Sequence, residues 1–258
     1  MKVTLISHTP DALVLLLKTK NTRLANVDDN PGDWSPEKKQ EHLDYMLDTI
    51  KSSWEFVDYV FEIEGVTRAF THQLVRNRMG SYAQESQRTI DASNNGWLNP
   101  LENVAANSDE IFSTHHEYDL ACATSFNIYS KLLQRGVPAQ DARGVLPTAT
   151  LTSITAKYNL RTLSDMAKLR LCTRTQGEFQ NVFRLMREAV LEQHPWAEPF
   201  LEVHCVATGT CAFPRYGKKD CPVYVPEMDN TSVREVARQK FKVVRFEAVP
   251  IANGGKTM

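Results

Sequence analysis

The fold of this 258-residue chain is decided by the stretch FEIEGVTRAFTHQLVRNRMGSYAQESQR, residues 61–88. Its first residues complete a segment, 56–64, in which apolar and polar side chains alternate, and this period of two predicts a strand. The apolar face consists of Val57, Tyr59, Phe61 and Ile63. Gly65 is expected to end the strand, and the residues that follow predict a helix over 66–79 that stops at Gly80.

Arginine is concentrated in and around this stretch. Four arginines and one acid lie between residues 68 and 88, and four basic residues and one acid lie between residues 161 and 174. The basic residues are Arg68, Arg76, Arg78, Arg88, Arg161, Lys168, Arg170 and Arg174. Either group fits a solvated face balanced by acids elsewhere, or an anionic site. Arg76 and Arg78 would point about 200° apart on one helix, so a shared role requires the helix to end nearby. Hydroxyls and amides in a predicted loop over 81–88 favour the anionic site, because they bind phosphate oxygens together with arginine.

The patterns on either side of this stretch predict a small sheet packed by long helices, an α+β fold. In the first half of the chain we expect a strand over 2–7, a helix over 11–17, a loop over 26–34, and a helix begun by Ser35-Pro36 with apolar Leu43, Met46, Leu47 and Ile50. Further on we expect a long helix over 111–133 ended by Gly136 and Pro138, a short helix over 141–146, a strand or extended link over 151–158, and one long helix over 162–193 closed by Pro195. Residues 205–226 are loop-like, and the basic stretch over 232–245 is a helix or a partner-binding tail, with a solvated tail favoured over a nucleic-acid site.

Composition and charge exclude several function classes. Hydrophobic residues make up 42% of the chain and charged residues 24%, which is ordinary for a globular protein. Thirty basic against 31 acidic residues give a formal net charge of -1, so nucleic-acid binding by bulk electrostatics is not expected. The usual glycine-rich signals of dinucleotide-binding and P-loop folds are missing. No apolar run approaches the roughly 20 residues of a membrane span, and polar residues interrupt the apolar N-terminal stretch, so we expect no secretory signal and a cytoplasmic protein.

The cysteines predict reduced thiols and no metal site. Five cysteines are an odd number scattered over a long chain, which is typical of a cytosolic protein rather than a disulfide framework. Cys205, Cys211 and Cys221, with nearby His204, raise the alternative of zinc, but their spacings do not match ordinary zinc knuckles. Cys172 is expected to be a core thiol.

Three blocks of the sequence resemble the flavin-dependent thymidylate synthases. The first is Arg76-Asn77-Arg78, seven residues and Ser86, where that family has Arg-His-Arg, seven residues and Ser. The second is ARGVLP at 142–147, similar to the family's Ala-Arg-x-Val-Leu-Pro. The third is Asn159-Leu-Arg161, Leu169-Arg170, Gln176 and Glu178, which resembles Asn-x-Arg, Leu-Arg and Gln-x-Glu. The resemblance covers roughly residues 1–225, so we expect one domain there and a basic tail over 226–258.

This resemblance implies a fold, a reaction and a set of ligands. It implies a central, mostly antiparallel sheet packed by long helices, and a homotetramer with active sites at the subunit interfaces. It also implies methylation of dUMP to dTMP with FAD, NADPH and methylenetetrahydrofolate. By matching position, the nucleotide would be held by Gln73, Arg76, Gln84, Ser86, Arg88, Arg143 and Arg170. The flavin would be held by Ser52, Arg76, Asn77, Arg78, Asn159, Arg161 and Asp165. Arg170 would be catalytic, because it would stabilise negative charge developing at the N3/O2 edge of the base.

The chain also departs from the family's pattern. Asn77 replaces the signature His, Gln84 replaces Glu, Thr89 replaces Tyr, Asp165 replaces Asn and Arg174 replaces His. The departures fit either a drifted thymidylate synthase or altered chemistry, such as methylation or hydroxymethylation of dUMP or dCMP; a non-catalytic nucleotide-binding homologue is the third alternative. A carboxylate at Asp165 could accept from the amine of a cytosine. An Asp165–Arg174 pair is not expected, because nine residues along one straight helix place them on roughly opposite faces.

Overall fold

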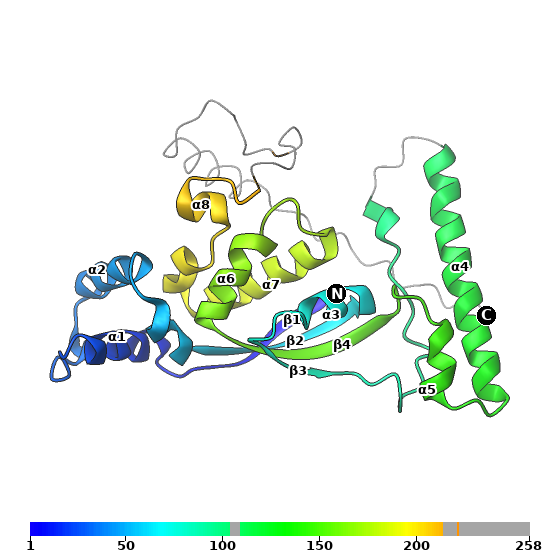
Figure 1. Ribbon diagram of the computed structural model, residues 1–258, viewed down its shortest axis with the longest axis horizontal. Coiled ribbons are helices and arrows are strands. Elements are labelled where there is room, and N and C mark those ends of the chain that lie inside the picture. Colours follow the sequence, from blue (N-terminus) through cyan, green and yellow to red (C-terminus); the bar gives the residue numbers. More distant parts are fainter. Residues whose placement is uncertain (104–108, 214–220, 222–258) are drawn as a thin grey trace.

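The computed structural model describes residues 1–103, 109–213 and 221. Figure 1 shows a sheet with helices above it and further helices at either end. The strands are β1 (Lys2–His8), β2 (Asp58–Thr67), β3 (Ser81–Gln84) and β4 (Leu151–Asn159). The α-helices are α1 (Ala12–Arg23), α2 (Pro36–Leu47), α3 (Arg68–Leu74), α4 (Asp109–Gln134), α5 (Ala139–Ala142), α6 (Leu160–Arg170), α7 (Gly177–Gln193) and α8 (His204–Thr208). Short 3-10 helices are η1 (Pro31–Asp33), η2 (Lys51–Phe56), η3 (Pro100–Asn103), η4 (Arg143–Val145) and η5 (Pro195–Phe200).

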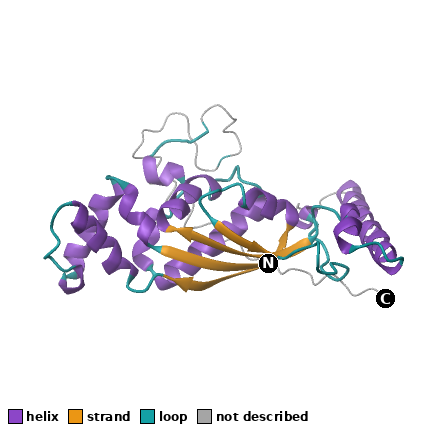
Figure 2. Cartoon of the chain, turned by 60° about the horizontal axis from the view of Figure 1, so that its bottom comes forward, coloured by secondary structure: helices purple, strands orange, loops and turns teal. Residues whose placement is uncertain are grey.

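The four strands form one sheet in the order β1-β2-β4-β3, and every pairing is antiparallel. The expected mostly antiparallel central sheet is therefore confirmed, and so is the apolar face of β2. All four predicted residues of that face have no exposed surface: Val57, Tyr59, Phe61 and Ile63. On the opposite face Glu62 and Lys157 are exposed, and in Figure 2, viewed from below, the strands lie in front of the helices. One face of the sheet thus carries the core and the other is polar, as is common for antiparallel sheets.

The prediction that Gly65 ends the strand is wrong. Strand β2 continues to Thr67, and its register with β4 shifts between Ile63 and Val66. Gly65 has a φ of 64°, a conformation that glycine adopts at little cost, and it allows a bulge rather than a stop.

The predicted helix over 66–79 and loop over 81–88 are each partly wrong. Helix α3 covers only Arg68–Leu74, because β2 occupies its expected start and a turn replaces its expected end. Residues Ser81–Gln84 form the edge strand β3, paired with β4 from Ser81 opposite Lys157 to Gln84 opposite Ile154. Pairing with a distant strand decided this structure, and local composition did not reveal it.

The predicted single helix over 162–193 is two helices, α6 and α7. Asn159 starts α6 as its N-cap, with its side-chain oxygen accepting from Thr162 N at 2.8 Å. The chain then turns before α7, and side chains satisfy the carbonyls at the end of α6. Thr175 Oγ1 donates to Leu169 O at 2.8 Å and Gln180 Nε2 donates to Leu171 O at 3.0 Å. Apolar residues recur at helical spacing within each helix, but none lies over residues 173–178, where the two helices separate.

Other predicted elements are confirmed with shifted ends. Ser35 caps α2 by accepting from Lys38 N, although the predicted apolar Ile50 is 69% exposed. Helix α1 runs on to Arg23, the helix predicted over 141–146 is α5 followed by η4, and the strand or link over 151–158 is the strand β4. The long helix α4 ends before Gly136, which has a φ of 83°.

The buried side chains form two clusters. The main one lies between the sheet and the helices above it and includes the β2 face, Phe179 and Met186. A small one lies under α4 and α5 and is built by Ala92, Tyr129 and Ala142. Within the described ranges, no helix combines the length and the apolar character needed to cross a membrane. The loop-like region predicted over 205–226 contains α8, and the basic stretch over 232–245 and the tail over 226–258 lie outside the described residues.

Candidate active site

The Arg76-Asn77-Arg78 block lies in a tight turn between α3 and β3. The turn is closed by Asn77, whose side-chain oxygen accepts from Met79 N at 3.1 Å and whose carbonyl accepts from the Tyr82 hydroxyl at 2.6 Å. A Cβ at Gly80 would lie 2.5 Å from Cε1 of Tyr158, so only glycine fits where the backbone crosses this ring. Helix α3 ends before Arg76 and Arg78, and both side chains are exposed on the turn. The angle that would point them apart on a continuous helix therefore does not apply.

Helix α3 is held at both ends by the start of α7. At its N-terminus, Thr67 Oγ1 caps the helix by accepting from Phe70 N at 3.0 Å. The Glu178 carboxylate in turn accepts from Thr67 N at 2.7 Å and from Thr67 Oγ1 at 2.6 Å. At the other end, Gln73 Nε2 donates to Gln176 Oε1 at 2.6 Å. Burial raises the pKa of the Glu178 carboxyl above its ordinary value, and the hydrogen bonds from Thr67 oppose this change.

Arg170, at the end of α6, lies beside an open pocket of about 270 Å³. Its guanidinium stacks on the Phe179 ring, 4.3 Å from the ring centre, which fixes its direction. Burial lowers the pKa of this guanidinium from its ordinary value. The pocket, called the Arg170 pocket below, is lined by Gln73, Leu169, Arg170, Arg174, Thr175, Gln176 and Phe213. The structure therefore brings together two predicted nucleotide ligands, Gln73 and Arg170, and adds Thr175 and Phe213, which sequence reasoning missed.

A second group of predicted nucleotide ligands lies beyond the end of β3. Arg143 donates from Nε to Gln140 O at 3.1 Å and lies close to Arg68. The pKa of the Arg68 guanidinium is lowered mainly by burial and next by the charge of Arg143. The same guanidinium donates to Glu85 O at 3.4 Å. Ser86 follows directly in the chain. Two guanidinium groups beside a serine suit a phosphate, and Arg68 was missed as a ligand although it belongs to the predicted arginine cluster.

Two further predicted nucleotide ligands have local roles. Gln84 Nε2 donates to Thr71 Oγ1 at 2.7 Å and so ties β3 to α3. Arg88 is exposed, and its backbone N–H donates to Ser86 Oγ at 3.3 Å in the turn after β3. Gln84 thus supports the segment, while the Arg88 side chain remains available at the surface.

Four of the predicted flavin ligands lie at or beside the start of α6: Ser52, Asn159, Arg161 and Asp165. The other three, Arg76, Asn77 and Arg78, lie in the turn between α3 and β3. Arg161 pairs with Glu55 at 2.6 Å and Asp165 pairs with Lys51 at 3.2 Å and with Lys168 at 3.5 Å. Ser52 is exposed on η2, beside Lys51. The assumption that Asp165 and Arg174 lie on one straight helix was wrong, because α6 ends before Arg174; Asp165 forms ion pairs with Lys51 and Lys168. Sequence reasoning missed Lys51, which lies 114 positions from Asp165, and Lys168 was noted only for its charge.

These groups are spread along one chain. Ser81 pairs with Lys157 near the start of α6, whereas Ser86 lies five residues further on, at most about 17 Å away in an extended chain.

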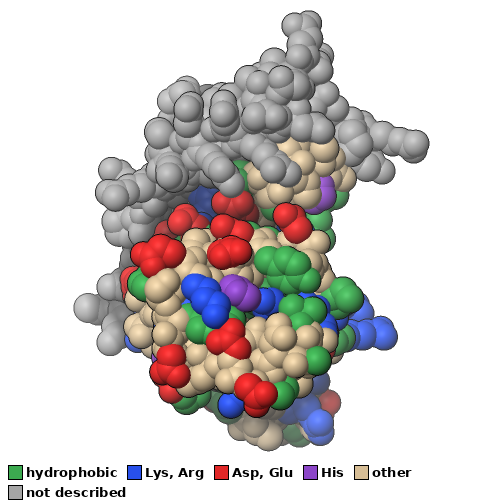
Figure 3. Space-filling view, turned by 90° about the vertical axis from the view of Figure 1, so that its left-hand side faces the viewer, with side chains coloured by type: hydrophobic (Ala, Val, Ile, Leu, Met, Phe, Trp, Pro, Cys, Tyr) green, Lys and Arg blue, Asp and Glu red, His purple; other side chains and the backbone are tan. Residues whose placement is uncertain are grey.

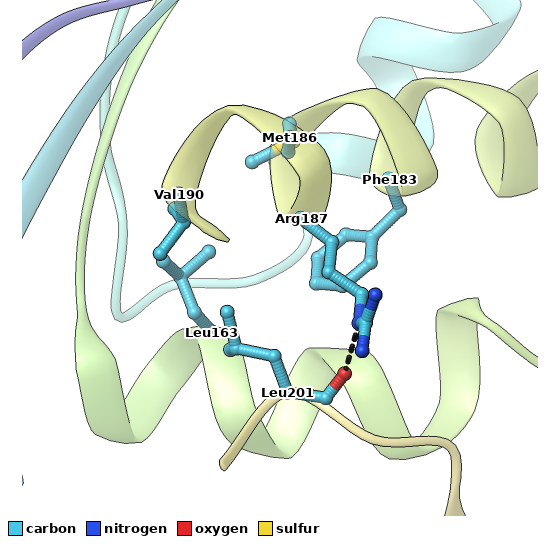
Figure 4. A pocket seen from close by; sticks show the side chains of 6 residues that line it. All are labelled: Leu163, Phe183, Met186, Arg187, Val190 and Leu201. Atoms are coloured by element: carbon cyan, nitrogen blue, oxygen red, sulfur yellow. Dashed lines mark hydrogen bonds between the residues drawn. The ribbon is translucent and has the colours of Figure 1, made fainter. Parts of the chain in front are cut away.

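The cavity in Figure 4, between α6, α7 and Leu201, has essentially no volume accessible to water. Arg187 closes it by donating from Nε to Leu201 O at 2.9 Å. A ligand therefore has room in the Arg170 pocket and not in this core cavity.

Other parts of the surface are weaker candidates for a ligand site. Figure 3 shows the end of the molecule with α1 and α2, where acidic side chains surround a few basic ones and a histidine. Here Lys20 and His42 are hydrogen-bonded to each other and Lys38 pairs with Asp29. Within the described ranges, no group of three or more His, Cys, Asp or Glu side chains could hold a metal ion.

Comparison with known proteins identifies the family. Residues 4–196 match the family model described as "Thymidylate synthase complementing protein". The "Flavin-dependent thymidylate synthase" of Geobacter sulfurreducens is 34% identical over 183 residues, covering 70% of this chain and 78% of that protein. The protein of the same name from Sulfolobus acidocaldarius is 28% identical over 261 residues, covering 97% and 92%.

A solved structure has the same fold. The "UMP/dUMP methylase PolB from Streptomyces cacaoi bound with 5-Br dUMP" superposes with a TM-score of 0.64 at 20% identity, covering 77% of this chain and 93% of that one. The resemblance found in the sequence is confirmed, and the chain belongs to the thymidylate synthase complementing protein family, a family of enzymes whose members include the flavin-dependent thymidylate synthases.

Proposed function

We propose that this enzyme methylates C5 of dUMP to give dTMP, with methylenetetrahydrofolate as the one-carbon donor, FAD as the flavin and NADPH as the reductant. The observation that carries the proposal is the Arg170 pocket, whose lining combines Arg170 with Gln73 and Gln176, and in which the Gln73–Gln176 hydrogen bond joins α3 to the start of α7. Small-molecule pockets usually measure about 300–1,000 Å³. At about 270 Å³, this one suits a pyrimidine nucleoside and is too small for a dinucleotide.

Arg170 has the properties that the reaction requires. Making C5 nucleophilic places negative charge on the N3/O2 edge of the base, and a fixed cation there lowers the barrier. The Arg170 guanidinium is fixed by the Phe179 ring. It stays protonated although burial lowers its pKa, because an arginine starts from a pKa of about 12.5 or more.

The phosphate is proposed to bind at Arg143, Ser86 and Arg88, with Arg68 as an additional ligand. Arg68 and Arg143 lie close enough to repel each other, and a phosphate dianion between them would relieve that repulsion. Arginine forms paired hydrogen bonds to phosphate oxygens, which fixes the orientation of the nucleotide as well as its position.

The start of α6 is proposed to hold the flavin, together with the exposed turn at Arg76–Arg78. The residue types there fit a diphosphate: among the residues that the structure describes, Lys51, Arg161 and Lys168 form ion pairs with two carboxylates, those of Glu55 and Asp165. When bound and reduced, FAD would supply the hydride that completes the methyl group. No cysteine nucleophile is required, and burial raises the pKa of the Cys122 thiol, which keeps it protonated.

The active enzyme is proposed to be a homotetramer. The candidate ligands lie on several separate segments of one chain, α3, β3, the turns beside them and the two ends of α6, so walls from neighbouring chains would be needed to enclose a large cofactor. We expect the Arg76–Arg88 segment to lie at a subunit interface. Sedimentation that shows a fully active monomer would overturn this part of the proposal.

The position of Asp165 favours dUMP over dCMP. Asp165 does not line the Arg170 pocket, and its carboxylate pairs with Lys51 and Lys168. A carboxylate held there gives no reason to expect recognition of a cytosine amine.

Mass spectrometry of reaction products tests the proposal. The protein is incubated with FAD, NADPH, methylenetetrahydrofolate and either dUMP or dCMP. We expect dTMP from dUMP and no product from dCMP. A 5-hydroxymethyl nucleotide, a methylated dCMP, or nucleotide binding without turnover would each contradict the proposed reaction.

A further inference from the structure

We propose that Phe213 forms the aromatic wall of the Arg170 pocket and stacks on the pyrimidine ring of the substrate. The inference rests on the proposed function and adds a specificity-determining residue to it. The family match ends at residue 196, so this wall comes from a part of the chain beyond the matched region. Phe213 is partly buried and lines the pocket together with Arg170 and Gln73.

The segment that carries Phe213 is anchored on the main core. Leu201, Val203 and Val206 are each no more than 5% exposed and belong to that core. Helix α8 packs on α6. It ends at Thr208 and is capped by Gly209, whose φ of 74° lets the chain leave the helix four residues before Phe213. A wall held in this way is in place before a ligand arrives.

Contacts between thiols join this segment to the turn that follows Arg170. The Cys205 thiol lies near Cys172 and Cys221, and Thr173 contacts the Cys221 sulfur at 3.9 Å. Phe213 N donates to Cys211 Sγ at 3.4 Å. Burial, more than these neighbours, raises the pKa of Cys205 to about 11, so the thiol is a protonated packing group rather than a nucleophile. The Phe213 segment and the turn after Arg170, which form two sides of the pocket, are therefore held by the same cluster of thiol contacts.

The chemistry of the lining points to a flat ring with carbonyl oxygens. Its polar groups are guanidinium, amide and hydroxyl donors, and its apolar groups are Leu169 and Phe213. Phe179 lies under the Arg170 guanidinium and is 1% exposed, so it has no face free for a ligand. Phe213 is the aromatic side chain in this lining, and an aromatic face beside hydrogen-bond donors suits a pyrimidine.

Calorimetry with two probes tests the stacking. Titrating dUMP measures the whole nucleotide, and titrating deoxyribose 5-phosphate measures the same ligand without its base. The proteins are the wild type, Phe213→Ala, Phe213→Leu, Phe213→Tyr and the control Tyr45→Ala, which removes an exposed aromatic ring from α2. We expect Phe213→Ala to weaken dUMP binding roughly 5- to 100-fold, the range of a stacked base, and to leave deoxyribose 5-phosphate binding unchanged.

The other variants separate stacking from folding. Phe213→Tyr should bind dUMP like the wild type, and Tyr45→Ala should have no effect. Phe213→Leu keeps an apolar side chain, so its melting temperature should match the wild type while dUMP binding still weakens. Unchanged dUMP affinity in Phe213→Ala and Phe213→Leu, or an equal loss for both probes, overturns the inference and leaves the proposed function standing. A wild type that binds no dUMP overturns both.

Discussion

The two ends of helix α6 are built in different ways. At its C-terminal end, Arg170 stacks on the buried Phe179 and faces a pocket whose rim is tied to α3 by Gln73 and Gln176. At its N-terminal end, the charged groups are open to solvent and pair with one another: Arg161 is 47% exposed and Asp165 is 56% exposed. The end proposed to bind the nucleotide base is thus held by contacts within the chain, whereas the end proposed to bind the flavin carries charged side chains that are largely exposed. Substitutions at the first end should therefore have the larger effects.

The largest effect is expected for Arg170→Ala. Removing a fixed donor from developing negative charge typically costs about 10²- to 10³-fold in kcat, so dTMP formation should fall by that factor. The measurement is the initial rate with saturating substrates. Arg135→Ala, an exposed arginine just after α4, is the matched control and should keep the wild-type rate. Equal rates for both variants would remove Arg170 from the mechanism.

A smaller effect is expected for Arg88→Ala and Arg143→Ala. Each would lose a charge-assisted hydrogen bond to the phosphate, about 1.5–3 kcal/mol of binding free energy. Neither side chain is buried, so melting temperatures should not change. Calorimetry with dUMP measures the loss, and unchanged affinity in both variants would reject the phosphate site.

The pH dependence of stability tests the role of Glu178, which holds the start of α3 near the Arg170 end of the site. Because its folded-state pKa is raised above the ordinary value of 4.5, the stability that it contributes is complete below that value and is lost as the pH rises through the raised pKa. Glu178→Gln should flatten this fall in the free energy of unfolding, measured by urea denaturation from about pH 4 to pH 8. Glu188→Gln, an exposed carboxyl on the same helix, should keep the wild-type slope. An unaltered slope in Glu178→Gln would show that another group titrates.

The smallest effect is expected for Asp165→Asn. Asp165 is 56% exposed, and its partners Lys51 and Lys168 are 28% and 27% exposed. Ion pairs at the surface contribute about 0–1 kcal/mol, so stability should hardly change. Removing a carboxylate from beside two lysines should keep or raise FAD affinity, measured by flavin fluorescence. Combined with Asn77→His, it should keep or raise the conversion of dUMP to dTMP. A large loss of FAD binding would mean that Asp165 contacts the flavin directly.

Local patterns in the sequence predicted much of this fold. The β2 face was predictable because alternation of apolar residues is a local signal. The edge strand at Ser81–Gln84 was not, since its structure comes from pairing with β4, about 70 residues away. The break between α6 and α7 was missed although residues 173–178 contain no apolar side chain and include Gly177.

The site was predictable only where short motifs carried it. Gln73 and Arg170 came from matching blocks, and the structure joins them in one pocket. Lys51 and Phe213 lie outside those blocks and reach their groups through tertiary packing. No spacing rule connects residues that the fold alone brings together.

The turn from Arg76 to Gly80 tolerates substitution at some positions and not at Gly80. Within the turn, the Asn77 side chain accepts one hydrogen bond, from Met79 N, so another side chain with an acceptor at this position can leave the backbone in place. At residue 80 a single added carbon would meet Tyr158 and Tyr82 within 3 Å, and both rings would have to move. The side chains of this turn can therefore differ among related proteins, whereas residue 80 has to remain glycine for the backbone to pass the two tyrosines.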